Sequence, residues 1–112
     1  MLNATPLLRL YQRWRMAALS RQNPASTQAA ELMRLLRRAK STAFGREHGF
    51  QHISSVAEYQ RQVPLRTYEQ FWSSYWKESF PHCRDITWPG VVPFHAVSSG
   101  TSSGTTKYIP CG

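Results

Sequence analysis

The chain has 112 residues, of which 41% are hydrophobic and 12% aromatic, a composition that fits one small globular domain and excludes a disordered tail. Its formal net charge of +8 is of the sign that nucleic-acid-binding domains carry. The charge is uneven, however, because residues 1–40 hold eight of the 14 basic residues and a single acid, Glu31. The aromatic-rich remainder is nearly neutral, which argues against a specific nucleic-acid partner.

Cysteine content and hydropathy set the expected compartment. Two cysteines, Cys83 and Cys111, are too few for a disulfide framework, and no histidine joins them at zinc-ligand spacing. We therefore predict no metal site and expect reduced cysteines in the cytoplasm. No apolar run approaches the roughly 20 residues that a membrane-spanning helix needs, so no transmembrane segment is predicted.

Residues 1–22 predict a basic amphipathic helix, because apolar side chains recur there at helical spacing among arginines, with no acid. Such a segment is typical of an organelle transit peptide or of a helix in a membrane interface. We favour instead a helix that docks on the protein's own body, with two aromatic anchors. The residues concerned are Leu7, Tyr11, Trp14 and Ala18 on the apolar face, and Arg9, Arg13, Arg15 and Arg21.

A second helix is predicted to start at Asn23-Pro24, since Asn caps free N–H groups and Pro suits the first helical position. One apolar face continues to Ala43, and Gly45 is predicted to end the helix. Residues 45–53 contain two glycines and are predicted to form a loop. The apolar face is made of Leu32, Leu35, Leu36, Ala39 and Ala43.

Two capping boxes predict two short helices further on. In the first, Ser55 would accept from the backbone N–H of Glu58, whose side chain would reach back. That helix should stop before Val63-Pro64, because the residue before a proline avoids helical geometry. The second box is Thr67 to Gln70.

An aromatic stripe follows the second box at steps of three and four residues. A stacking platform for nucleic-acid bases is one interpretation. We favour a helix face that packs into the core, since the neighbouring charges sum to the wrong sign for a phosphate-binding face. The stripe consists of Tyr68, Phe71, Trp72, Tyr75, Trp76 and Phe80, and the neighbouring charges are Glu69, Lys77 and Glu78.

The composition becomes β-like after Pro81. Residues 85–88 are predicted to form a short strand, and Pro89-Gly90 a turn. The apolar run 91–97 predicts a second strand, and residues 107–109 begin a third.

Residues 98–107 separate the last two strands and contain only Ser, Thr and Gly before a lysine. Glycines let the backbone N–H groups approach an anion, and hydroxyls and a lysine add donors and charge. The loop is not a P-loop, because three residues rather than four separate Gly100 from Gly104, and Lys107 does not follow at once. From composition alone, a phosphate-binding loop and a flexible Ser/Gly linker are equally good interpretations.

Several ordered blocks of sequence carry a family resemblance. The loop resembles the first signature of the adenylate-forming superfamily, and its form followed by Lys-Tyr-Ile-Pro is similar to the auxin-responsive promoter family of acyl acid–amido synthetases. Upstream blocks resemble the same family. They are Thr42-Ala43-Phe44-Gly45-Arg46-Glu47-His48-Gly49-Phe50, Val63-Pro64-Leu65-Arg66-Thr67-Tyr68-Glu69 and Trp88-Pro89-Gly90.

The resemblance implies a two-step ligase that uses ATP and Mg²⁺. A small carboxylic acid would form an acyl-adenylate and then be transferred to an amine, commonly an amino acid. Such a loop acts by positioning and electrostatics. No catalytic residue is assigned, and His48 and His95 receive no role. The residues expected to hold the ATP phosphates are Ser98, Ser99, Gly100, Thr101, Ser102 and Lys107.

The expected fold class is an α+β fragment: N-terminal helices followed by the first strands of an adenylate-forming α/β large domain. Residues 1–22 would be the basic helix, and residues 23–112 the N-terminal part of the large domain. Because family members are several times longer, we expect this chain to be inactive alone and not to bind ATP and Mg²⁺ tightly, or to pair with a separate chain that completes the fold. The alternative function is a small basic module that binds nucleic acid or an anionic membrane through its N-terminal helices.

Overall fold

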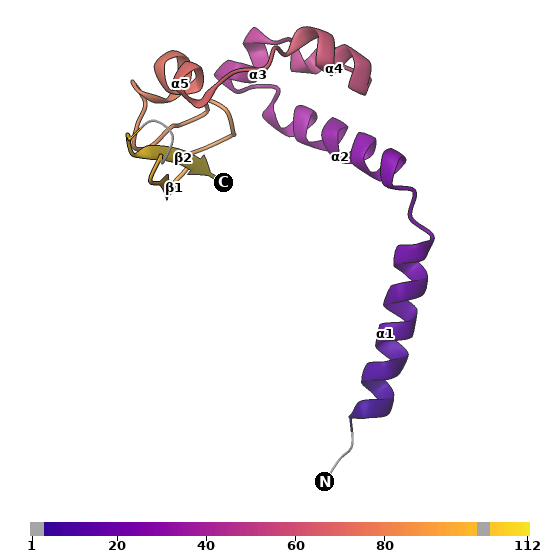
Figure 1. Ribbon diagram of the computed structural model, residues 1–112. Coiled ribbons are helices and arrows are strands. Elements are labelled where there is room, and N and C mark those ends of the chain that lie inside the picture. Colours follow the sequence, from indigo (N-terminus) through magenta and orange to yellow (C-terminus); the bar gives the residue numbers. More distant parts are fainter. Residues whose placement is uncertain (1–3, 101–103) are drawn as a thin grey trace. The chain divides into compact units, whose positions relative to one another are not determined.

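The computed structural model describes residues 4–100 and 104–112 (Figure 1). Within these ranges it has five α-helices, two short helical segments and one two-stranded antiparallel sheet, so the predicted α+β class is confirmed. The elements are α1 (Thr5–Ser20), α2 (Pro24–Ala39), α3 (Ala43–Glu47), η1 (Phe50–His52), α4 (Val56–Gln62), α5 (Tyr68–Phe71), η2 (Trp72–Trp76), β1 (Phe94–Ser98) and β2 (Lys107–Cys111).

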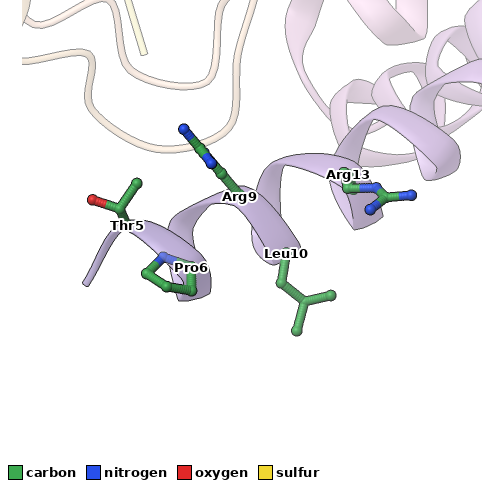
Figure 2. Close-up of a pocket in the computed structure, with 5 residues that line it drawn as sticks. All are labelled: Thr5, Pro6, Arg9, Leu10 and Arg13. Carbon is green, nitrogen blue, oxygen red and sulfur yellow. The ribbon is translucent and has the colours of Figure 1, made fainter. Parts of the chain in front are cut away.

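The chain divides into two compact units, residues 1–31 and residues 32–112. The predicted domain boundary between residues 22 and 23 stays a prediction. In the first unit, α1 forms where the arginine-rich helix is expected, with Pro6 in its first turn. A hollow on α1 is lined by Thr5, Pro6, Arg9, Leu10 and Arg13 (Figure 2).

The large apolar side chains of α1 are exposed, and the docking of Tyr11 and Trp14 on the protein's own body stays a prediction. Among the described residues, none of the helices has the length and apolar character needed to cross a bilayer.

The start of α2 is confirmed, but its predicted end is wrong. The Oδ1 of Asn23 accepts from the N–H of Ser26 (3.3 Å) at the helix start. The helix ends at Ala39 rather than at Gly45, because Thr42 begins a new helix. The Thr42 hydroxyl donates to the carbonyl of Ala39 (2.7 Å) and accepts from the N–H of Gly45 (3.0 Å). A single buried side chain therefore closes α2 and caps α3.

Gly45 lies inside α3 instead of terminating a helix, and the predicted loop over residues 45–53 contains part of α3 and all of η1. A Cβ atom on Gly45 would lie 2.1 Å from the carbonyl oxygen of Ala39. The glycine is therefore needed for the close approach of α3 to the end of α2. Gly49, with φ of 62°, makes the turn between α3 and η1.

One of the two predicted capping boxes is confirmed, and only half of the other is present. Thr67 and Gln70 bond each other's backbone N–H groups as expected. Ser55 accepts from the N–H of Glu58 (3.2 Å), but the Glu58 carboxylate accepts from the N–H (2.7 Å) and hydroxyl (2.9 Å) of Ser54 instead of reaching Ser55. The predicted end of α4 before Val63-Pro64 is confirmed.

The core of the second unit is built around Phe44. Its ring stacks on His48 (4.1 Å between ring centroids) and on Phe71 (5.6 Å), and it meets Tyr75 edge-on (5.0 Å). Phe71 of α5 and Tyr75 of η2 therefore join the core, as predicted for the stripe. The buried apolar members are Leu36, Ala39, Phe44, Phe50 and Ile53.

The aromatic stripe does not follow one regular helix. From Trp72 the helix widens to π geometry, in which the N–H of Lys77 donates to the carbonyl of Trp72 (2.9 Å). This wider turn brings Phe71 and Trp76, five residues apart, into a stack with ring centroids 5.1 Å apart. Trp72 and other rings of the stripe instead contact the hairpin of β1 and β2, as described below.

The predicted strand over residues 85–88 is wrong. Turns and bends occupy this segment, because its backbone is used elsewhere: the carbonyls of Asp85 and Ile86 accept from the N–H groups of Ala43 and Phe44 (both 2.9 Å). They satisfy donors at the start of α3 that have no partner within the helix. The predicted Pro89-Gly90 turn is confirmed, with Gly90 at φ of 81°.

The two remaining strands form an antiparallel hairpin, β1 with β2, in which Phe94 pairs with Cys111 and Ser98 with Lys107. The predicted strand from residue 107 is confirmed. The predicted strand over residues 91–97 begins only at Phe94, since Pro93 has no N–H to give to a ladder.

Replacing Gly45 by Ala is expected to lower the free energy of unfolding by about 1–3 kcal/mol, the usual cost of forcing an extra methyl group into a packed site. At an open helical position the same change would stabilise the chain by about 1 kcal/mol. Urea unfolding followed by circular dichroism measures the difference. A more stable variant would contradict the close approach to the carbonyl of Ala39.

Candidate functional site

The candidate site is the loop that connects β1 to β2. Ser98 ends β1 and pairs with Lys107, the first residue of β2. The hairpin therefore brings the hydroxyl end of the predicted phosphate-binding loop beside its lysine. Ser98 and Ser99 are exposed, whereas Gly100 is buried. Thr101 and Ser102, also predicted to bind phosphate, lie outside the described residues.

Two glycines give the described part of the loop its backbone path. Gly100 and Gly104 have positive φ values of 56° and 68°, which favour glycine because it lacks a Cβ atom. The N–H of Gly104 donates to the carbonyl of Gly100 (2.7 Å), so these two glycines lie together. A Cβ atom on Gly104 would meet nothing within 4 Å. The requirement there is the backbone angle and not the available space.

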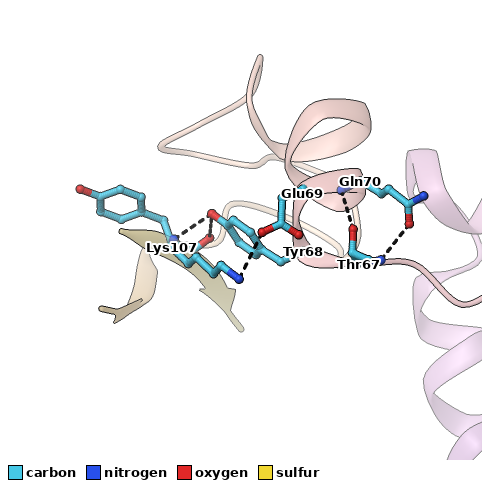
Figure 3. A network of polar contacts seen from close by, with 6 residues as sticks. Thr67, Tyr68, Glu69, Gln70 and Lys107 are labelled. Carbon is cyan, nitrogen blue, oxygen red and sulfur yellow. Dashed lines mark hydrogen bonds and ion pairs between the residues drawn. The ribbon is translucent and has the colours of Figure 1, made fainter. Parts of the chain in front are cut away.

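Lys107 is held at the exit of the loop by two residues at the start of α5 (Figure 3). Its Nζ lies 3.2 Å from Oε1 of Glu69 and 5.3 Å from the centroid of the Tyr68 ring. The Lys107 side chain is 21% exposed, against 62% for Glu69. The predicted phosphate-binding cation is thus a positioned ion-pair partner, open to solvent on the side of the carboxylate.

Tyr68 ties this end of α5 to the hairpin. Its hydroxyl accepts from the N–H of Tyr108 (2.9 Å) and donates to the carbonyl of the same residue (3.3 Å) (Figure 3). Tyr108 also lies against Phe80 and Trp72, with ring centroids 5.3 and 6.4 Å apart. Because the Thr67–Gln70 box fixes the first turn of α5, the position of Lys107 is linked to that helix.

The Glu69 carboxylate is stabilised in its charged form. A hydrogen bond from its own backbone N–H lowers its pKa most, followed by the hydrogen bond from Lys107. Glu69 also lies in the first turn of α5, where a negative charge is favoured by the helix dipole. The carboxylate is therefore ionised at neutral pH.

A hollow of about 310 Å³ opens between the start of α5 and the residues on either side of Lys107, although Lys107 itself does not line it. Hydroxyls and aromatic faces line it, together with the single Glu69 carboxylate. Its residues are Tyr68, Glu69, Trp72, Thr105, Thr106 and Tyr108. Hydroxyl donors and a nearby ammonium group suit an anionic ligand, because both donate hydrogen bonds to phosphate oxygens.

The donor set suits an anionic group better than a bare cation. Within residues 4–100 and 104–112, no three His, Cys, Asp or Glu side chains gather as metal ligands. Mg²⁺ commonly binds through one or two carboxylates together with the phosphates of a nucleotide. Glu69 is the carboxylate nearest to the hairpin lysine in this site.

His48 and His95, to which the sequence assigns no role, both pack against other side chains of the fold. The Nδ1 of His48 lies 2.8 Å from the carbonyl of Phe44, and its ring is stacked in the core. The Nε2 of His95 lies 3.7 Å from Sγ of the buried Cys83, and its ring meets Phe80 edge-on.

Sequence reasoning did not assign Tyr68 or Glu69 to the site. Both belong to the block Val63–Glu69 that resembles the family, although no role followed from the block itself. Their relevance comes from contacts that span about 40 residues, such as the pair Glu69–Lys107. The block was therefore the only signal in the sequence that pointed to them.

Glu69 is expected to titrate below the ordinary range of a glutamate. Replacing Lys107 by Met should raise this pKa but leave it below that range, because the backbone N–H remains. Since the folded-state pKa is depressed, the stabilisation from the pair is complete above the ordinary value and is lost as the pH falls through the lowered value. Carboxyl-carbon NMR shifts measured against pH test this, with Lys77→Met as the control. An unchanged Glu69 titration in Lys107→Met would contradict the ion pair.

One protein-family model matches most of the chain. The model of the GH3 family N-terminal domain matches residues 15–112 of the chain. A search of curated proteins and a search of solved structures each found no match. The matched region includes the whole hairpin and both residues that hold Lys107, and it confirms the resemblance drawn from the sequence. The chain belongs to the GH3 family, the auxin-responsive promoter family of acyl acid–amido synthetases.

Proposed function

We propose that the β1–β2 loop binds the triphosphate of ATP for an acyl acid–amido synthetase. The observation that carries the proposal is Lys107, which the hairpin register places opposite Ser98 and which Glu69 holds in position. A cation held at the mouth of a glycine and hydroxyl loop is suited to a polyphosphate, because its charge already lies beside the groups that would bind phosphate. The family supplies the class of reaction, in which a carboxylic acid is activated and then joined to an amine.

The proposed roles follow from the groups that each residue offers. Ser98 and Ser99 present exposed hydroxyls, and Gly100 presents a backbone in the positive-φ region. Thr101 and Ser102 are proposed to add N–H and hydroxyl donors, and Lys107 to add charge. Bound ATP with Mg²⁺ would supply the adenylyl group for the acid and pyrophosphate as the leaving group, while this chain binds and orients the phosphates.

The proposal extends to the fold of the larger domain and to the cellular compartment. We propose that the helices and hairpin are the first part of an adenylate-forming α/β large domain, in which the hairpin loop is the phosphate-binding signature. The described structure has two free cysteines, Cys83 and Cys111, which suit a reducing compartment such as the cytoplasm.

Replacing Lys107 by Gln is expected to weaken binding of Mg²⁺-ATP about tenfold or more, the effect of losing one hydrogen bond from a charged group. Isothermal titration calorimetry on the whole chain measures the affinity. Inorganic triphosphate should compete, since the proposed contacts are to phosphate oxygens.

The matched control is Lys77→Gln, which removes the same charge from an exposed position outside the hairpin. It should bind Mg²⁺-ATP like the unaltered chain. Equal affinities in Lys107→Gln and Lys77→Gln, or no measurable binding by the unaltered chain, would refute the assignment of the loop.

Replacing Glu69 by Gln is expected to strengthen Mg²⁺-ATP binding about two- to fivefold, the range of an exposed ion pair. The reason is that the carboxylate competes with phosphate for the Lys107 ammonium group, and its negative charge also repels the phosphate. The double variant Glu69→Gln with Lys107→Gln should lose this gain. Weaker binding by Glu69→Gln alone would instead indicate that the carboxylate contributes to the site, for example by holding the ion.

A further inference from the structure

The N-terminal helix is the part of the chain that the proposed function does not use. The family match begins at residue 15, so most of α1 lies outside it. The helix carries Arg9, Arg13 and Arg15 and no acidic residue. It therefore combines a net positive charge with an unusual amount of exposed apolar surface.

Arg9 and Arg13 lie on a different face of α1 from most of its apolar side chains, whereas Arg15 lies at the edge of the apolar face. At 3.6 residues per turn, Leu7, Tyr11 and Trp14 share one face. They are 73%, 60% and 63% exposed. Arg9 and Arg13, four residues apart, share the other side of the helix. Figure 2 shows Arg9 and Leu10 pointing in different directions from the helix.

Aromatic residues strengthen the apolar face. The rings of Tyr11 and Trp14 lie 6.1 Å apart between centroids. Tyr and Trp have apolar bodies and a polar tip, and they are favoured where one end of a side chain is apolar and the other is wet. Their place on the apolar face, with arginines on the other, is typical of a helix that lies in a membrane interface.

We propose that α1 binds the surface of an anionic membrane and lies in the interface with Leu7, Tyr11 and Trp14 inserted. The charge selects the partner, because arginines without acids are attracted to anionic headgroups. A nucleic acid would use the arginines but would leave the Leu and Trp side chains in water. A lipid surface satisfies both faces of the helix. The proposal is independent of the phosphate-binding loop.

The test is flotation of the whole chain with vesicles of phosphatidylcholine, alone or mixed with phosphatidylserine. Binding is expected only to the mixed vesicles and should weaken as salt is raised, since added salt screens the attraction. Arg9→Gln with Arg13→Gln should bind about 30-fold more weakly, because each arginine near an anionic surface is worth roughly a fivefold change.

The matched control is Arg37→Gln with Arg84→Gln, which removes the same charge from exposed positions of the second unit. It should bind the vesicles like the unaltered chain. A blue shift of tryptophan fluorescence on binding should disappear in Trp14→Phe, which would place that ring in the lipid. Circular dichroism of each variant checks that the helices are kept.

Three outcomes would overturn the proposal. The first is no binding to the mixed vesicles at low salt, as expected if α1 docks on the protein itself. The second is an equal loss of binding in both arginine pairs, which would show attraction by overall charge alone. The third is a chain that binds duplex DNA or RNA through Arg9 and Arg13 and does not bind vesicles.

Discussion

The backbone bonds between α3 and the segment at residues 85–86 hold the second unit together. They join two parts of the chain about 40 residues apart, because the N–H groups of Ala43 and Phe44 find their acceptors there. The buried hydroxyl of Thr42 caps α3 by accepting from the N–H of Gly45. Phe44 is thereby fixed at the centre of the core, and the chain beyond residue 86 is set on the path that leads to β1. Buried backbone groups must be paired, so this junction constrains both the core and the hairpin.

The aromatic stripe carries that constraint to the candidate site. Its π-helical turn lets rings from one short stretch point in two directions: Phe71 and Tyr75 pack on Phe44, while Trp72 contacts Tyr108 of the hairpin. The first turn of α5 then presents the two groups that hold Lys107. A change in the core that moves α5 should therefore move the lysine as well.

The features that the sequence predicted correctly depend mostly on residues close together in the chain. Asn23, Thr67 and the proline after Val63 act within one helical turn, so their effects on helix ends follow from neighbouring residues. The errors arise where a distant segment supplies the partner. Gly45 looks like a helix terminator, yet it is required by the approach of another helix end. Residues 85–88 resemble a strand, yet their carbonyls serve a helix start. Glu69 was counted as one charge beside the stripe, because nothing in the sequence pairs it with a lysine 38 positions later.

The exposed ion pair at the loop also explains why a binding site can be held ready without being blocked. A surface carboxylate contributes little net stability to its pair with lysine, because water and salt screen both charges. The carboxylate and the Tyr68 ring together hold the Lys107 side chain at the exit of the loop. A polyphosphate, with several charges, would attract the same ammonium group more strongly than one carboxylate does. Under the proposed function, the lysine would exchange Glu69 for phosphate when the ligand binds, while the hydroxyl of Tyr68 keeps the strand in place through its hydrogen bonds to Tyr108.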